Sequence, residues 1–175
     1  MQPRASSIPT HTACRASEAG LDVSAAMTAG FVAGWVALVA WIACSVSIYD
    51  EPASKLPRMI AAMILGQGAL GTEDEPELAV VATGLVLHFA LALSFGTALA
   101  LLVRHVREGL AACAGALFGV ALYVLDLHLL TAFFPWFTQL RTLDTLGAHM
   151  LFGILAATAY RDLASPPSAT SPPRR

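Results

Sequence analysis

The chain has 175 residues, of which 57% are hydrophobic and only 13% are charged, and its mean hydropathy is +0.67. Soluble domains carry about 25% charged residues, so this composition excludes an ordinary water-soluble globular protein. The net charge of −2 also argues against a nucleic-acid partner, because such a partner requires a strongly basic surface.

Long segments without charged residues predict membrane-spanning helices, because a helix of about 20 apolar residues crosses a bilayer. We therefore predict an all-α, polytopic membrane protein whose domain in the lipid bilayer (23–163) is a four-transmembrane-helix bundle. The four spans are expected at 24–48, 78–103, 110–133 and 143–160. The flanking segments, 1–22 and 164–175, are rich in Pro, Ser, Thr and Arg, and are predicted to be a disordered leader and a disordered tail.

Four crossings place the two termini and the loop between the second and third spans on one side of the membrane. That side holds seven basic residues and the opposite side holds three, so the positive-inside rule predicts that both termini are cytoplasmic. Arginine outnumbers lysine nine to one in this alanine-rich chain, which favours a bacterial source and hence the bacterial inner membrane. The basic residues are Arg4, Arg15, Arg104, Arg107, Arg161, Arg174 and Arg175 on the first side, and Lys55, Arg58 and Arg141 on the second.

The first external loop contains a short apolar segment, 57–66, with proline at its start and glycine at its end. Proline and glycine favour these two helix ends, so we predict a short helix there. Because about 10 residues cannot cross the bilayer, this helix should be interfacial or re-entrant and act either as an anchor or as a lid. Its buried face is expected to be Met59, Ile60, Met63 and Ile64, beside an outer aromatic belt of Trp41, Tyr49, Phe133, Phe134, Trp136 and Phe137.

Small residues spaced four apart predict where the spans contact one another, because they allow two helix backbones to approach closely in a membrane. Each predicted span carries such a row. The first and third spans also share a pattern, since Ala29-Gly30-x-x-x-Gly34 recurs as Ala114-Gly115-x-x-x-Gly119, which favours a duplicated pair of helices. The predicted packing glycines are Gly30, Gly34, Gly84, Gly96, Gly115, Gly119 and Gly153.

Ionisable residues inside the predicted spans are the strongest candidates for function, because a charge at the membrane centre costs about 2.5–3.5 kcal/mol. At a rise of about 1.5 Å per residue, His88, Asp126 and His149 all fall in the outer half of the bilayer. Asp126 shares a helix face with the glycine row of its span, so we expect these three side chains to form a polar cluster inside the bundle. His128 is a secondary candidate, because its helical angle points it about 160° away from Asp126.

Three roles stay open for this cluster. It can fix the register of the helices through polar contacts, it can handle protons or ions, or it can hold a metal ion or a haem through its two histidines. Loss of Asp126 would then cost folding, activity or cofactor, respectively. We expect no cofactor, with haem or a metal ion as the alternative.

The sequence contains no motif typical of an enzyme, since Cys-x-x-Cys pairs, nucleotide-binding glycine loops and HExxH metal motifs are all absent. We therefore expect no catalytic residues and no enzymatic activity. The leading prediction is a structural, accessory or interaction component of the membrane, with a homo-oligomer or a membrane-protein partner as its expected partners. The alternatives are a small oligomeric transporter or ion- or proton-handling protein that uses the polar cluster, and a haem- or metal-binding redox subunit.

Several spaced motifs carry a resemblance to a known group. They are Pro57-Arg-Met-Ile-Ala-Ala, Leu87-His88-Phe89, Gly115-Ala-Leu-Phe-Gly119-Val-Ala-Leu-Tyr123, Phe134-Pro-Trp-Phe137 and Ala148-His149. Over about 30–161 the chain resembles small uncharacterised bacterial four-helix integral membrane proteins, some of which bear a sodium:proline symporter label. The resemblance implies a membrane protein without an established activity. Because four spans lack the broken helices of known symporter sites, the label would imply action as an oligomer.

Overall fold

The computed structural model describes residues 20–71 and 78–164. Of these residues, 87% are helical and none lies in a strand, which confirms the predicted all-α class. Three helical stretches are long and apolar enough to cross a membrane, namely α1 (Val23–Tyr49), α3 (Leu78–Val103) and the stretch Gly109–Ala132. The chain is therefore an apolar, helical protein suited to a lipid bilayer.

The remaining elements are shorter or more polar. The stretch Gly109–Ala132 consists of most of α4 (Glu108–Val124), the π-helix η2 (Leu125–Leu129) and the 3-10 turn η3 (Leu130–Ala132). The long helix α5 is less apolar than the three candidate spans. The bounds of the other elements are Lys55–Leu65 for α2, Gln67–Leu70 for η1, Pro135–Leu140 for η4 and Leu143–Ala164 for α5.

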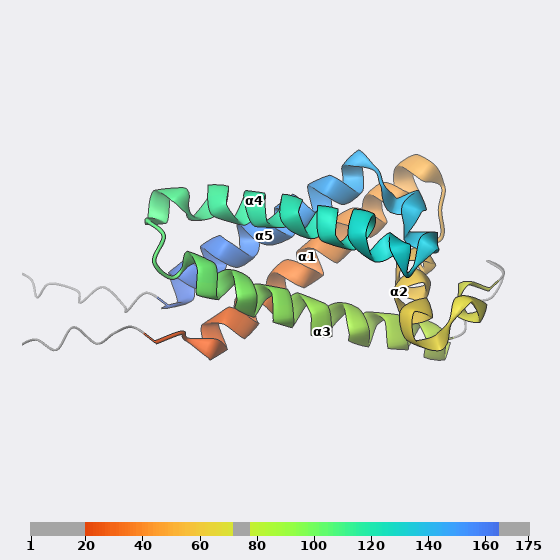
Figure 1. Cartoon of the computed structure of the whole chain (residues 1–175), viewed down its shortest axis with the longest axis horizontal. Coiled ribbons are helices and arrows are strands. Elements are labelled where there is room, and N and C mark those ends of the chain that lie inside the picture. Colours follow the sequence, from red (N-terminus) through yellow and green to blue (C-terminus); the bar gives the residue numbers. More distant parts are fainter. Residues whose placement is uncertain (1–19, 72–77, 165–175) are drawn as a thin grey trace, which may run out of the picture.

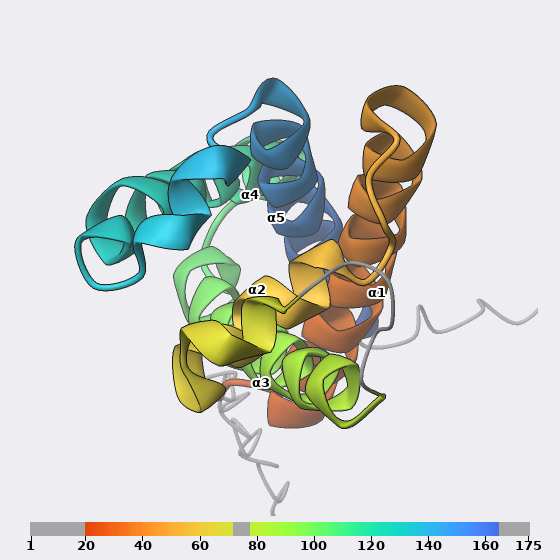
Figure 2. The same ribbon diagram turned by 90° about the vertical axis from the view of Figure 1, so that its right-hand side faces the viewer.

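The long helices run side by side, and α2 lies across one end of them (Figures 1 and 2). The described chain begins and ends at the opposite end, where α3 also turns into α4 (Figure 1). This arrangement puts α2 and η4 at one end of the bundle and both ends of the described chain at the other.

The first helix begins with a polar cap. The side chain of Asp22 accepts a hydrogen bond from the backbone N–H of Ala25 at 2.9 Å, which satisfies a donor that the first helical turn leaves free. Asp22 was predicted to belong to a disordered leader, so the ordered part begins earlier than the sequence suggested. Otherwise residues 1–19 and 165–175 lie outside the described residues.

Glycine faces hold the helices in two pairs. A methyl group added at Gly115 would overlap the carbonyl oxygen of Gly153, and one added at Gly30 would lie 2.8 Å from the carbonyl oxygen of Ala92. The pairs α4–α5 and α1–α3 thus approach backbone to backbone, as small residues allow in membranes. The remaining predicted packing glycines, Gly34, Gly84, Gly96 and Gly119, also face a neighbouring element at distances that leave no room for a side chain.

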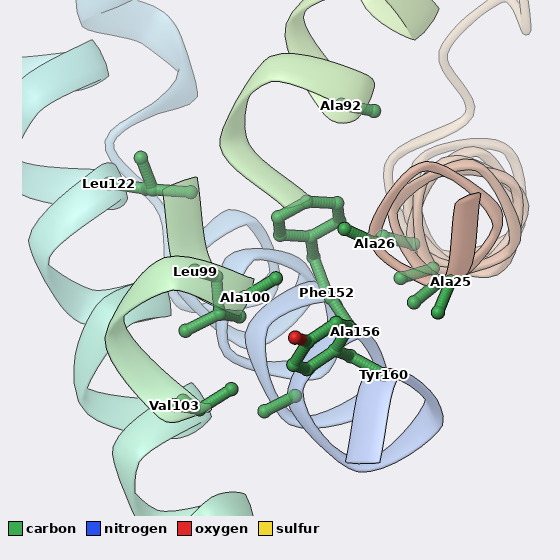
Figure 3. Packing of buried hydrophobic residues seen from close by; sticks show 14 residues of the cluster. Ala25, Ala26, Ala92, Leu99, Ala100, Val103, Leu122, Phe152, Ala156 and Tyr160 are labelled. Carbon is green, nitrogen blue, oxygen red and sulfur yellow. The ribbon is translucent and has the colours of Figure 1, made fainter. Parts of the chain in front are cut away.

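The main apolar core lies in the half of the bundle away from α2. In Figure 3, Phe152, Ala156 and Tyr160 of α5 project among residues of α1 and α3. Leu99 and Val103 of α3 are each only 1% exposed, so this half of the molecule is filled by side chains. The core members are Ala25, Ala26, Ala29, Ala33, Ala37, Ala92, Leu99, Ala100, Val103, Leu122, Phe152, Ala156, Ala157 and Tyr160.

The short helix differs from its predicted form. It begins at Lys55, ahead of the predicted start at residue 57, and ends at Leu65. Met59 and Ile60 are buried, whereas Ile64 is 66% exposed, so the predicted buried face was wrong at Ile64. Burial follows position along α2: residues 57–62 are buried, whereas Ile64 and Leu65 lie at the exposed C-terminal end of the helix.

Three further predictions need correction. Trp41 was assigned to an outer aromatic belt, but its side chain is only 4% exposed, because it packs inside the bundle and bonds to Thr145 of α5. The third span was predicted as one helix over 110–133, yet its α-helical part ends at Val124 and a π-helix follows. The fourth helix runs to Ala164 rather than to residue 160.

Candidate ligand-binding cavity

An apolar cavity of about 250 Å³ lies between the long helices at the end covered by α2. Its walls come from α1, α3, α4 with η2, and α5, while α2 and η4 close the end. Few polar groups reach it. The lining residues are Ala37, Leu38, Trp41, Leu56, Ile60, Met63, His88, Leu91, Ala92, Phe95, Leu122, Leu125, Asp126, Leu127, Leu130, Phe137, Leu140, Thr145, Ala148, His149 and Phe152.

The π-helix places Asp126 in the wall of this cavity. Its wide turn interrupts the regular i to i−4 hydrogen bonds of α4, and such turns are frequent at functional sites. Arg141, which follows η4, supports the interrupted segment. Its Nε donates to the carbonyl of Leu127 at 2.6 Å, and its Nη2 donates to Oγ1 of Thr131 at 2.7 Å. The guanidinium group therefore donates to the Leu127 carbonyl, a backbone acceptor of the interrupted segment.

Asp126 and His149 form a hydrogen-bonded pair across the α4–α5 contact. Oδ2 of Asp126 lies 3.4 Å from Nε2 of His149, and the two side chains are 27% and 22% exposed. On the other side of the ring, Nδ1 of His149 lies 2.8 Å from the carbonyl oxygen of Thr145. The hydroxyl of Thr145 in turn accepts a hydrogen bond from Nε1 of Trp41 at 2.9 Å, which connects α1 to the same network.

These contacts fix the hydrogens of the pair. A carbonyl oxygen only accepts hydrogen bonds, so Nδ1 of His149 must carry a hydrogen. A neutral imidazole with hydrogen on Nδ1 has none on Nε2, and an ionised carboxylate has none either. The hydrogen bond between Nε2 and Asp126 therefore requires one additional proton, held by either residue. In both arrangements the net charge of the pair is zero, as its apolar surroundings favour.

His88 lines the same cavity but belongs to a different contact. Its Nε2 lies 3.3 Å from the carbonyl oxygen of Gly34, so this nitrogen donates to the backbone of α1. The structure thus brings Asp126 and His149 into contact with each other, while His88 shares their cavity and bonds elsewhere. His128 is exposed, does not line the cavity, and its ring centroid lies 5.6 Å from that of Tyr123.

No three metal-binding side chains converge among residues 20–71 and 78–164. Cys44 and Cys113 are both free cysteines. A haem or metal ion bound by the two histidines stays a prediction, which an absorption spectrum and elemental analysis of the purified protein would test.

Sequence reasoning missed three residues of the site. Trp41 and Thr145 belong to the hydrogen-bond network of His149, and Arg141 supports the π-helix that carries Asp126. Thr145 precedes His149 by four residues, which places the two on one face of a helix, and this spacing could have identified it. Arg141 gave no such signal, because its acceptors include a backbone carbonyl. The partner of Trp41 is 104 positions away in the chain, a separation at which no local pattern exists.

Comparisons with known proteins give no match: no protein-family model, no curated protein and no solved structure is similar to this chain. The resemblance to small bacterial four-helix membrane proteins therefore stays a prediction from the motifs. The cavity and its polar groups are the features of this chain that indicate a function.

Proposed function

We propose that the protein crosses the bacterial inner membrane four times, with α5 as the fourth span and both termini in the cytoplasm. The 22 residues of α5 correspond to about 33 Å of helix, enough to cross a hydrocarbon core of about 30 Å. The extensive packing of α5 against α1 and α4 supports this placement. Arg104 and Arg107 lie between α3 and α4, and Arg161 lies in the last turn of α5. These segments are at the end where the described chain begins and ends (Figure 1), which supports a cytoplasmic position for that end.

We further propose that the protein is a non-catalytic membrane component that binds a lipid-soluble small molecule in the cavity. The observation that carries this proposal is the cavity itself, which is mostly apolar and edged by a few polar groups. Ligand sites have this composition, since apolar walls supply affinity and a few polar groups orient the ligand. A volume of about 250 Å³ is close to the lower end of the range for small-molecule sites, about 300 Å³.

A purely structural role for the polar cluster has less support. The glycine faces already bring α4 against α5 and α1 against α3 without polar side chains. Asp126 and His149 keep about a quarter of their surface exposed, whereas polar residues that only fix helix register are expected to be enclosed in the helix contact. The pair is therefore better placed to meet a ligand.

The test is to identify what the purified protein carries. The protein would be isolated in a mild detergent, extracted with organic solvent and analysed by mass spectrometry, with and without prior exposure to a bacterial lipid extract. We expect a lipid-soluble molecule in about equimolar amount. Ala148→Phe fills the cavity and should remove that molecule.

Gly147→Phe is the matched control, because a side chain at Gly147 would meet nothing within 4 Å. It adds the same ring next to Ala148 but outside the cavity, and should leave the bound molecule in place. Equal occupancy in the two variants, or an empty wild-type protein after exposure to the lipid extract, would contradict the proposed function.

A transporter or proton-handling role is the second candidate, favoured by the π-helix at Asp126. Interrupted helices near polar groups are a recurring element of membrane transport sites, and this interruption was not expected from the sequence. Flux measurements in proteoliposomes, comparing wild type with Asp126→Asn, would test this role.

A further inference from the structure

We propose that the ligand of the cavity is a lipid-soluble organic cation, and that the Asp126–His149 pair releases its additional proton when that cation binds. This inference rests on the proposed function, since it assumes that the cavity binds a small molecule. It specifies the charge of the ligand and the release of a proton in exchange for the bound cation.

The exchange follows from the hydrogen bonds of the pair. With no ligand, the pair holds one proton beyond the hydrogen that Nδ1 of His149 donates to Thr145. When a cation binds, Asp126 becomes a carboxylate beside it, His149 stays a neutral imidazole, and the released proton passes to water. One positive charge enters and one leaves, so the net charge of the apolar cavity does not change.

The walls of the cavity suit a cation. Four aromatic side chains line it, contributed by α1, α3, η4 and α5: Trp41, Phe95, Phe137 and Phe152. The faces of aromatic rings attract cations, and tryptophan does so most strongly. Asp126 is the only carboxylate among the described lining residues, and none of them is a lysine or arginine that would repel the ligand.

Other ionisable groups lie near the pair but are engaged elsewhere. His88 donates to Gly34 across the cavity, and Arg141 donates to Leu127 and Thr131. Asp144 accepts from Tyr49. The remaining neighbours are Tyr123 and His128, whose rings contact each other, and Lys55 and Arg58 of α2, which contact Glu51 and Ala69.

The experiment measures binding and proton release together. The probe is 4-phenylbutyl-trimethylammonium, whose quaternary nitrogen carries no proton, so any proton released must come from the protein. Calorimetric titrations in two buffers of different ionisation enthalpy give the number of protons released. We expect about one proton released per bound molecule.

The uncharged analogue, in which a tert-butyl group replaces trimethylammonium, separates this inference from the proposed function. It should bind more weakly than the cation and release no proton. If cation and analogue bind equally well without proton release, the cavity binds small molecules but the exchange is refuted. If neither binds, both proposals fail.

Asp126→Asn removes the carboxylate and should weaken cation binding more than tenfold while the analogue still binds, which shows that the variant is folded. Asp144→Asn, an acid outside the cavity, is the matched control and should behave as wild type. Proton release that persists in Asp126→Asn would overturn the assignment to this pair.

Discussion

Gly115 and Gly153 face each other across α4 and α5 so closely that a methyl group on either would overlap the carbonyl oxygen of the other. The contact therefore depends on two positions that exclude every larger side chain. Gly153→Leu should prevent the helices from packing and lower the stability by about 3 kcal/mol or more, at the upper end of the cost of overpacking. Thermal unfolding in detergent would measure this loss.

Gly147→Leu is the control on the same helix, since that position is open. It should unfold within a few degrees of the wild type. If both variants have the same melting temperature, close packing of α4 against α5 does not stabilise the fold.

Thr145→Val should break the buried link between α1 and α5. The change keeps the shape of the side chain but leaves Nε1 of Trp41 without its acceptor at 2.9 Å. An unsatisfied buried donor costs about 1–3 kcal/mol, so the melting temperature should fall. The emission maximum of Trp41 should also shift. This shift is best observed with Trp35 and Trp136 replaced by phenylalanine. An unchanged spectrum and stability would show that the hydrogen bond is not formed.

Arg141→Met should loosen the π-helix that carries Asp126. The guanidinium bonds to Leu127 and Thr131, and bonds from a charged donor contribute about 1.5–3 kcal/mol each. We expect faster amide hydrogen exchange over 125–132 and weaker binding of the cationic probe, with α1 and α3 unaffected. An equal rise in amide hydrogen exchange across the whole bundle would contradict this local role.

Gly84→Val should detach α2 from α3, because a side chain at Gly84 would overlap the backbone of Pro57. Amide exchange over 55–65 should rise while the helices behind it stay protected. Ala82→Val places a valine at an exposed position of α3 and should leave α2 protected. Protection of α2 in the Gly84 variant would mean that the close contact is not formed.

Single cysteines would test the proposed orientation. In a variant lacking the three native cysteines, Gly68→Cys on the α2 side and Gly109→Cys at the start of α4 both occupy open positions. A membrane-impermeant maleimide should label Gly68→Cys in intact spheroplasts and label Gly109→Cys only after lysis. The reverse pattern would invert the proposed topology.

The sequence allowed the long apolar helices to be predicted closely, because absence of charge over a membrane-length segment is a strong signal. The observed α1 and α3 begin and end within one residue of the predicted spans. The interruption of α4 could not be predicted, because residues 125–132 contain neither proline nor glycine, the residues that most often break a helix. What distinguishes this segment is the backbone bond of Arg141 to Leu127, and a backbone acceptor leaves no mark in the sequence.

The candidate site was predictable in part. Asp126, His88 and His149 stood out as ionisable residues in apolar segments, and all three line one cavity. The separation of His88 from the Asp126–His149 pair was not predictable, because the partner of His88 is a backbone group, the carbonyl of Gly34. Inferring the shared proton also required the position of Thr145 relative to the His149 ring, which only the structure supplies.

The two ends of the bundle are closed to different degrees. Away from α2, Leu99, Val103 and Tyr160 fill the interior, and Arg161 donates to the carbonyl of Arg104 at 3.0 Å, which fastens α5 to the end of α3. Toward α2, the same helices surround open space. A molecule dissolved in the bilayer would therefore reach the cavity from the leaflet nearest α2, and the protein would sample only one of the two lipid monolayers.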